Sequence, residues 1–430
     1  MPKGGLPPGL RWPALAQSVA LIRFRHSFVP WLHRRYGDVF TIRVVPHGRQ
    51  IVMFSRPEHI REIFAGDPEV FYAGKGNASL GTLMGEHSLL LVDAAEHKRA
   101  RKLLMPAFTA RALKGYEAMV HGIASAEVES WSTGTSFRSL DRMNAVTLEI
   151  IMQVVFGLTD EAQLARLRPL LRAVIDVSPA VLVGVGYPRL QRFGIWKTFV
   201  ENQSRLDDAL YELIAERRAD SSLEGRSDVL SRLMLVGGHE GEVPLNDAEL
   251  RDQLITLLLA GHETTATALA WTLYELGRSR AQLTRAQQAV DDDDDAYLEA
   301  VLKESMRLHP VIPMVNRLLM KPATIGGIDL PAGVSVAPSI ILSHLENFPD
   351  AGEFRPTRFL DEKVAPNSWI PFGGGVRRCI GAGFSLMEGT AVLREVLRRY
   401  DVTADGDDEP KVRNITSVPG RGARISVSPR

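Results

Sequence analysis

Residues 372–381 read Phe-Gly-Gly-Gly-Val-Arg-Arg-Cys-Ile-Gly, and they contain Cys379, the only cysteine of the 430-residue chain. The glycines lack a Cβ, so the backbone here can approach a flat cofactor closely. Arg377 and Arg378 add positive charge, which lowers the pKa of a thiol and suits a cofactor that carries carboxylates. A buried cysteine that acts as a small apolar residue is the alternative. The pattern favours a thiol that serves as a ligand.

This stretch resembles the haem-binding loop of the cytochrome P-450 monooxygenases, Phe-x-x-Gly-x-Arg-x-Cys-x-Gly. Its defining positions are matched by Phe372, Gly375, Arg377, Cys379 and Gly381. The resemblance implies haem b (iron protoporphyrin IX) as the cofactor, with Cys379 as the axial ligand of the iron. It also implies a mainly α fold with small β-sheets, in which a triangular α-rich unit has a β-rich margin. In that fold the haem lies between a long central helix and the cysteine loop.

Composition is that of an ordinary globular protein, with 45% hydrophobic and 24% charged residues. No linker or repeat divides the chain, so we expect residues 1–430 to form a single domain. The net charge is zero, which gives no case for nucleic acid or an anionic membrane as a partner. A single cysteine excludes an internal disulfide and fits the cytoplasm. The apolar run Trp12–Ile22 is shorter than the roughly 20 residues that span a bilayer, so we expect no membrane anchor.

Helical patterns dominate from about residue 96 to 308, and β-like stretches lie near 39–54, 324–336 and 411–427. The first of these reads as a hairpin. Five aspartates at 291–295 repel one another and favour a solvated loop.

One helix is expected to be unusually long. Asn246 and Glu249 fit an N-terminal capping pattern, and no proline interrupts the helical sequence that follows as far as Gly277. Its length of about 45 Å would cross a whole domain. Apolar residues at 254–260 indicate that it is buried in the core.

Residues 260–265 of this helix read Ala-Gly-His-Glu-Thr-Thr. A kinked helix whose hydroxyls bond back to the backbone would explain this sequence without a function. The resemblance instead implies the oxygen-binding turn of the P-450 family. There Gly261 would open a groove for dioxygen, and Glu263 and Thr264 would form an acid–alcohol pair that relays protons. The presence of this pair favours oxygen activation.

Glu304 and Arg307 are three residues apart on one helix face, where they can meet. Such pairs are common on surfaces and contribute little there. The motif at 354–359, Phe-Arg-Pro-Thr-Arg-Phe, gives the pair more weight. The resemblance implies a buried structural triad of Glu304, Arg307 and Arg358 behind the haem loop.

His97 and Arg101 are four residues apart and share one helix face. A basic helix face is usually a solvated surface with no specific role. The resemblance implies that both bind the haem propionates, with Arg317 and Arg377 as further propionate ligands.

The implied reaction inserts one oxygen atom from O2 into an apolar small molecule such as a terpene, fatty acid, steroid or polyketide, a hydroxylation typical of secondary metabolism. No electron-carrying domain is evident, so electrons would come from a separate ferredoxin and ferredoxin reductase. A peroxide-driven peroxygenase and a non-catalytic haem-binding sensor remain alternatives. An acidic ferredoxin would be attracted by the basic residues Lys98, Arg99, Lys102, Arg378, Arg394, Arg398 and Arg399. The expected substrate pocket comprises Leu80, Leu83, Met84, Leu90, Ala260, Val311, Ile312, Met314 and Val418.

Overall fold

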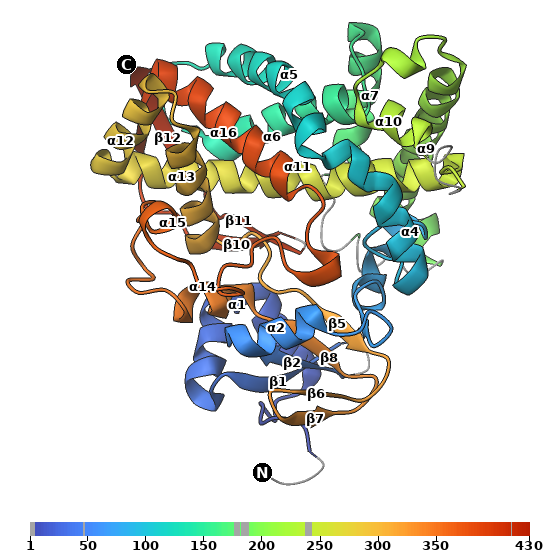
Figure 1. Ribbon diagram of the computed structural model, residues 1–430, viewed down its shortest axis with the longest axis vertical. Coiled ribbons are helices and arrows are strands. Elements are labelled where there is room, and N and C mark those ends of the chain that lie inside the picture. Colours follow the sequence, from blue (N-terminus) through green and yellow to red (C-terminus); the bar gives the residue numbers. More distant parts are fainter. Residues whose placement is uncertain (1–4, 46–47, 176–180, 182–188, 237–242, 414) are drawn as a thin grey trace.

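Helices form most of the molecule, and the strands gather in small β-sheets (Figure 1). The computed structural model describes the chain except for residues 1–4, 46–47, 176–180, 182–188, 237–242 and 414. The N-terminus and strands such as β1 (Val39–Val44) and β8 (Ser335–Pro338) occupy the lower part of Figure 1, whereas β12 (Arg424–Pro429) lies at the upper left beside the C-terminus. Most of the helices occupy the upper part. A mainly α chain with small sheets is therefore confirmed.

The long helix α11 (Asp247–Arg278) crosses the full width of the α-rich part (Figure 1). It begins where the sequence predicts. The Asn246 side chain accepts a hydrogen bond from the Glu249 N–H, and the Glu249 carboxylate accepts one from the Asn246 N–H, each at 2.9 Å. This capping box satisfies backbone donors that the first turn leaves without partners.

Helices pack around α11 on several sides. Its neighbours include α6 (Ser139–Ile150), which continues as the π-helix η3 (Ile151–Val155), and α13 (Asp295–Leu308). Helix α16 (Ala382–Arg399) packs against α5 (Ala110–Glu129), and α7 (Glu161–Ile175) against α9 (Gly194–Ala219). Further helices are α1 (Ala14–Tyr36), α2 (Pro57–Ala65), α3 (Gly81–Met84), α4 (Ala94–Leu104), α10 (Val229–Leu235), α12 (Arg280–Asp291), α14 (Ile340–Glu346) and α15 (Arg358–Asp361). The short 3₁₀ turns are η1 (Lys75–Leu80), η2 (Met105–Phe108), η4 (Leu190–Arg192), η5 (Leu223–Gly225) and η6 (Gly375–Arg377).

The largest sheet has five strands in the order β1-β2-β8-β5-β3. Its strands are β1 (Val39–Val44), β2 (Arg49–Phe54), β3 (Phe71–Tyr72), β5 (Arg317–Leu319) and β8 (Ser335–Pro338). β1 and β2 form the expected hairpin, which pairs Val39 with Phe54. A second sheet contains the strands β4 (Phe137–Arg138), β12 (Arg424–Pro429) and β9 (Tyr400–Ala404). Two further sheets have two strands each: β6 (Ala323–Ile325) with β7 (Ile328–Leu330), and β10 (Pro410–Arg413) with β11 (Thr416–Pro419). Strands thus lie in all three regions where the sequence predicts them.

The largest hydrophobic core surrounds α11 and includes Trp271, Leu269 and Tyr274, all nearly inaccessible to solvent. Two smaller cores lie beside the five-stranded sheet, one against α2 and the other against α1. No helix within the described ranges is both long enough and apolar enough to span a bilayer.

Glu304, Arg307 and Arg358 meet in the interior, where all three side chains are fully buried. The Arg307 guanidinium donates to both carboxylate oxygens of Glu304, at 2.8 and 3.0 Å, and Arg358 Nε donates to Glu304 Oε1 at 3.0 Å. Both arginines also donate to backbone carbonyls of residues 344–353. The triad therefore fastens the chain between α14 and α15 to α13.

The aspartate run at 291–295 is exposed throughout and turns between two helices, as the sequence suggests, but it is also held by specific partners. Asp291 ends α12 and Asp295 begins α13. Asp294 caps α13 by accepting from the Ala296 and Tyr297 N–H groups, and Asp293 accepts from the buried Arg394 at 2.6 Å. Arg394 also forms an ion pair with Asp295. Partners distant in sequence offset the repulsion between the aspartates.

Replacement of Glu304 by glutamine should destabilise the fold by about 3–5 kcal/mol, because two buried guanidinium groups lose their counter-charge. Urea unfolding measures this change. The control is Glu299→Gln, which removes a solvent-accessible ion pair with Lys303 and should cost no more than about 0.5 kcal/mol. Equal midpoints for the two variants would contradict this account of the triad.

Candidate functional site

The loop that carries Cys379 is closed by its own backbone. The Cys379 N–H donates to the Phe372 carbonyl at 2.9 Å, and the Arg378 N–H donates to the Gly375 carbonyl at 3.1 Å. Gly375 has a φ of +65°, which favours glycine, and a Cβ there would lie 2.0 Å from the Phe64 carbonyl oxygen of α2. The glycines at 374 and 375 thus let the loop pack against α2. The sequence suggested a different reason for them, the close approach of a cofactor.

Cys379 lies just before the first turn of α16, and Gly381 caps that helix. The side chain is accessible at its surface although it lies deep in the molecule. Burial raises the pKa of the thiol, while a hydrogen bond from the Gly381 N–H and the charges of Arg101 and Arg378 oppose that rise. The expectation that cations lower this pKa is wrong in its net direction, because burial is the larger effect.

The middle of α11 contains one solvent-accessible residue and contacts the first turn of α16. Of the described residues from Leu250 to Leu276, Ala260 alone is exposed. The Thr264 hydroxyl donates to the Ala260 carbonyl at 2.6 Å, and Thr265 and Ser385 join α11 to α16 through their hydroxyls at 3.2 Å. Ser385 follows Cys379 by less than two helical turns, so this accessible turn of α11 and the thiol belong to one site.

Gly261 lies against η3. A Cβ on this residue would lie 3.3 Å from Ile151 Cδ1 of η3, so the glycine permits close packing of η3 against α11. Its expected role in opening a groove for dioxygen stays a prediction.

Glu263 and Thr264 do not bond to each other. Neighbouring residues on a helix point in different directions, and the Glu263 carboxylate lies beside the β10–β11 hairpin. There it accepts from Thr416 Oγ1 at 3.2 Å and pairs with Arg413 at 3.4 Å. Glu263 and Arg413 also line a cavity of about 350 Å³ with polar walls that include Asp141 and His262. The Glu263 carboxylate thus extends from the accessible turn of α11 into the lining of a polar cavity.

Three arginines gather around His97, and one of them, Arg101, also acts on the Cys379 thiol. His97 of α4 is buried, and burial together with the charges of Arg377, Arg101 and Arg317 lowers its pKa to about 3. Burial lowers the pKa of Arg317 and of Arg377 to about 10 each. Among the described residues, no carboxylate forms an ion pair with Arg101 or Arg317. This excess of positive charge suits an anionic group, which the carboxylates of a haem supply.

Arg377 is more firmly engaged than the sequence suggests. Its guanidinium donates to the Leu89 carbonyl at 3.1 Å, to the Val92 carbonyl and to the Asp93 carboxylate. Asp93 also accepts from the Gly74 and Lys75 N–H groups, at 2.8 and 2.9 Å. The remaining N–H groups of Arg377 are still available to a propionate.

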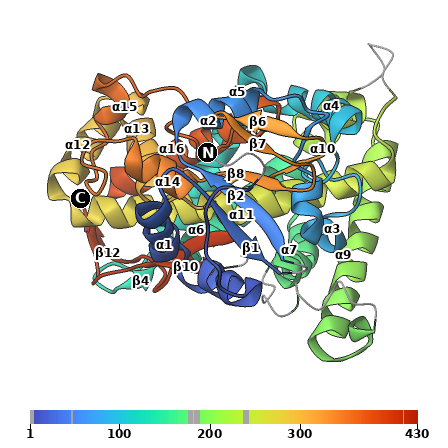
Figure 2. The ribbon, with the colours of Figure 1, turned by 90° about the horizontal axis from the view of Figure 1, so that it is seen from below.

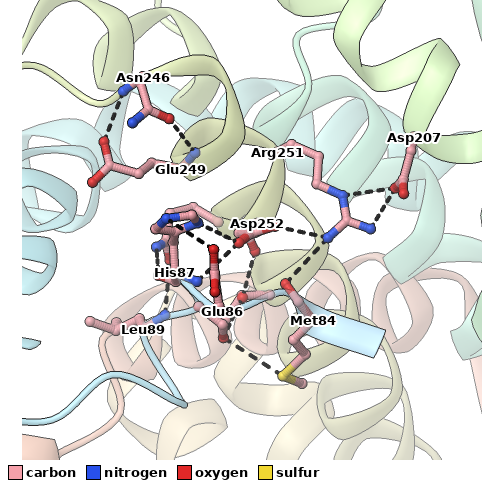
Figure 3. Close-up of polar contacts among 12 residues, drawn as sticks. Met84, Glu86, His87, Leu89, Asp207, Asn246, Glu249, Arg251 and Asp252 are labelled. Carbon is pink, nitrogen blue, oxygen red and sulfur yellow. Dashed lines mark hydrogen bonds and ion pairs between the residues drawn. The ribbon is translucent and has the colours of Figure 1, made fainter. Parts of the chain in front are cut away.

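Residues 84–93, the segment that receives Arg377, are fixed in turn to α11 (Figure 3). Asp252 accepts from the His87 N–H at 3.0 Å and contacts the His87 ring at 2.9 Å. Arg251 donates to Asp252 at 2.8 Å and to Asp207 of α9 at 2.7 Å. Figure 3 shows Arg251 between Asp252 and Asp207. This network positions the chain that leads into α4 and His97.

The residues expected to line a substrate pocket are divided among several environments. Leu83, Met84 and Val418 are buried, and Ala260 is exposed. The side chains of Val311, Ile312 and Met314 pack against three different cores, and Met314 belongs to the one beside α1. Leu80 and Leu90 are partly buried. The family resemblance also implies that residues 174–188 border the pocket, and of these 176–180 and 182–188 lie outside the described residues.

The surface expected to attract an acidic partner has fewer exposed cations than the sequence implies. Arg99 donates to Glu249 of α11 at 2.5 Å, and Arg399 donates to Glu395 at 2.6 Å. Arg398 lies 3.5 Å from Glu395, and Arg394 is buried against the aspartate run. Lys98, Lys102 and Arg378 are exposed.

His344 of α14 has a structural role that the sequence does not reveal. Its Nε2 accepts from the Ile370 N–H at 3.0 Å, which fixes the remaining proton on Nδ1 facing the Arg307 carbonyl at 3.2 Å. The ring thereby joins α13 to the segment that enters the cysteine loop.

The whole chain is similar to known proteins of one family. A family model described as Cytochrome P450 matches residues 6–424. A protein of Mycobacterium tuberculosis (strain ATCC 25618 / H37Rv) named cytochrome P450 135A1 is 52% identical, covering 99% of this chain and 96% of its own. A protein of Mycobacterium bovis (strain ATCC BAA-935 / AF2122/97) named cytochrome P450 135B1 is 39% identical, and the match covers 98% of this chain and 91% of that protein.

Solved structures share the fold. The retinoic acid-bound cyanobacterial CYP120A1 has a TM-score of 0.86 at 23% identity, covering 99% of both chains. The haem domain of cytochrome P450DA has a TM-score of 0.84 at 24% identity, covering 99% of this chain and 98% of its own. The fold that the cysteine loop predicts is confirmed.

His344 should make the fold sensitive to acid. Burial and the Arg307 charge lower its pKa to about 3, whereas the unfolded chain has an ordinary histidine pKa of about 6.5. Below about pH 6.5 the unfolded state binds a proton that the folded state excludes, so stability falls as the pH falls. Between about pH 6.5 and 4.5 the parent should lose about 2 kcal/mol more than His344→Gln, as measured by urea unfolding. Equal losses of stability in the parent and in His344→Gln would rule out His344 as the source of the acid sensitivity.

Proposed function

Because the chain belongs to the cytochrome P450 family, we propose that it inserts one oxygen atom from O2 into an apolar small molecule. Membership makes it a haem-thiolate monooxygenase; haem b, the substrate class and a separate ferredoxin with its reductase are the proposed details. The observation that carries the use of O2 is the turn of α11 with Ala260, Glu263 and Thr264, which opens beside the cysteine loop.

The residues present suit a haem. Cys379 offers an accessible sulfur for the iron, and His97, Arg101, Arg317 and Arg377 offer donors for two propionates. A neutral His97 can still donate one N–H to a carboxylate. When bound, a haem with a thiolate ligand supplies electron density that favours O–O cleavage.

Glu263 and Thr264 are proposed to deliver protons on the open side of α11. Glu263 can exchange protons with the polar cavity of about 350 Å³ that it lines. Rotation away from Thr416 and Arg413 would carry its carboxyl group toward the open turn. The Thr264 hydroxyl, held now by the Ala260 carbonyl at 2.6 Å, would accept a hydrogen bond and pass the proton on.

An apolar substrate is supported by the apolar character of the residues that the family resemblance assigns to the pocket. Leu83, Met84 and Val311 carry no charge, and Ala260 leaves space beside the helix. A terpene, fatty acid, steroid or polyketide would match such walls. Electrons are proposed to enter on the side of Lys98, Lys102 and Arg378, to which an acidic ferredoxin would be attracted.

Replacement of Thr264 by alanine should uncouple the reaction, so that reductant is consumed and peroxide is released in place of product. A positioned proton donor contributes about 10²–10⁴-fold, so product formed per electron pair should fall by about tenfold or more. A substrate for this assay can be found by screening apolar compounds for a haem spin-state shift. Product and peroxide are then measured with a ferredoxin and its reductase.

The matched control is Thr272→Ala, because the Thr272 hydroxyl makes the same bond to the carbonyl four residues earlier, at 2.7 Å, in a buried turn of α11. Its coupling should equal that of the parent. Unchanged coupling in Thr264→Ala would contradict the proton-delivery role, and parent-like product formation with peroxide alone as oxidant would favour a peroxygenase.

A further inference from the structure

The first half of α1 exposes its apolar side chains and buries its polar ones. Leu15, Val19 and Ile22 are 63%, 53% and 58% exposed, whereas Gln17 is fully buried and Ser18 is 5% exposed. These three apolar residues are spaced by four and three positions, so they form one stripe on the helix. A surface helix normally turns such a stripe toward the core.

Polar contacts hold the helix in this orientation. Gln17 accepts from the Arg43 N–H at 3.0 Å and donates to the Trp12 carbonyl at 2.8 Å, and Ser18 accepts from the Val45 N–H at 3.0 Å. A kink at Phe24, with φ −131° and ψ 24°, separates residues 14–23 from the rest of α1. The exposed stripe is therefore a consequence of specific bonds to β1 and its following turn.

The apolar surface continues onto neighbouring segments. Val45 is 46% exposed beside Ser18, and Ile415 is 49% exposed where its carbonyl accepts from Arg25 at 3.2 Å. Figure 2 shows α1 on the outside of the molecule next to β10. We define the α1 face by its exposed apolar residues, which are Trp12, Leu15, Val19, Ile22, Phe24, Val45 and Ile415.

Exposed cations lie at the two ends of the apolar stripe. Residues 1–37 contain six lysines and arginines and no aspartate or glutamate, although the chain as a whole has no net charge. The cations at the two ends of the stripe are Arg11 and Arg23. Trp12, at its edge, stacks on Phe28 and Trp31 with ring centroids 6.3 and 6.2 Å apart. Cations and tryptophans beside an apolar helical stripe are typical of helices that lie in a membrane interface.

We propose that the α1 face docks on an anionic lipid surface, with residues 14–23 lying in the plane of the interface. Ten residues of helix measure about 15 Å, half of the hydrocarbon thickness, so this helix lies on the bilayer without crossing it. A second copy of the chain is a poorer occupant, because a symmetric contact through this face would bring the Arg11 and Arg23 charges of two molecules together.

Docking here would place the membrane close to the β10–β11 hairpin. Ile415 belongs to the α1 face, and the next residue, Thr416, donates to Glu263 of α11. An apolar compound dissolved in the bilayer would then lie one hairpin away from the central helix.

Co-sedimentation of the purified holoenzyme with vesicles tests the proposal. Vesicles of phosphatidylcholine mixed with phosphatidylglycerol should bind the protein, and vesicles of phosphatidylcholine alone should bind it less. The triple variant Leu15→Ser/Val19→Ser/Ile22→Ser should lose more than about a hundredfold in partition coefficient. Arg11→Ser/Arg23→Ser should lose about fivefold for each arginine, and binding should weaken as salt rises.

The matched control is Leu235→Ser/Met320→Ser/Leu360→Ser, which removes three apolar side chains that are 39%, 42% and 41% exposed elsewhere. It should bind vesicles as the parent does. Circular dichroism of all variants should match the parent, because each substitution is at the surface. A parent that stays in the supernatant with both vesicle types overturns the proposal. A parent dimer that the α1 triple variant dissociates, without vesicle binding, assigns the face to a second copy instead.

Discussion

The ion pair between Arg377 and Asp93 is the contact on which the geometry of the haem site depends. It joins the loop that carries Cys379 to the segment that leads into α4, and carbonyls of Leu89 and Val92 add further bonds. The same segment is bonded to Asp252 on α11. The thiol, the basic cluster around His97 and the accessible turn of α11 are therefore fixed relative to one another by one continuous set of polar contacts.

Buried polar and charged groups hold the chain that leads into the cysteine loop. Glu304 accepts from two arginines. His344 donates to the Arg307 carbonyl, on the same helix as Glu304, and accepts from the N–H of Ile370, two residues before Phe372. Buried charges of this kind are costly to assemble and costly to break. They hold a loop that supplies an accessible cysteine, where packing alone would favour burying the side chain.

Local sequence patterns predicted the elements that depend on local interactions. Asn246 and Glu249 gave the start of α11, and the Phe372–Gly381 pattern gave the loop and the family. Contacts between distant residues were beyond such patterns. Asp293 and Asp295 form ion pairs with Arg394, which is about 100 residues away in the sequence. Arg99 likewise donates to Glu249, 150 residues away. Likewise, the direction of the Cys379 pKa depends on burial, which no sequence motif reports.

The account is tested most directly by the absorption spectrum of the reduced protein with carbon monoxide bound. Ligation of the haem iron by the Cys379 thiolate should give a strongly red-shifted Soret band, because a thiolate donates more electron density to the iron than an imidazole does. Cys379→His should retain haem through the donors around His97 while the band moves to the position typical of imidazole ligation. A red-shifted band that persists in Cys379→His would contradict the assignment of this cysteine as the iron ligand.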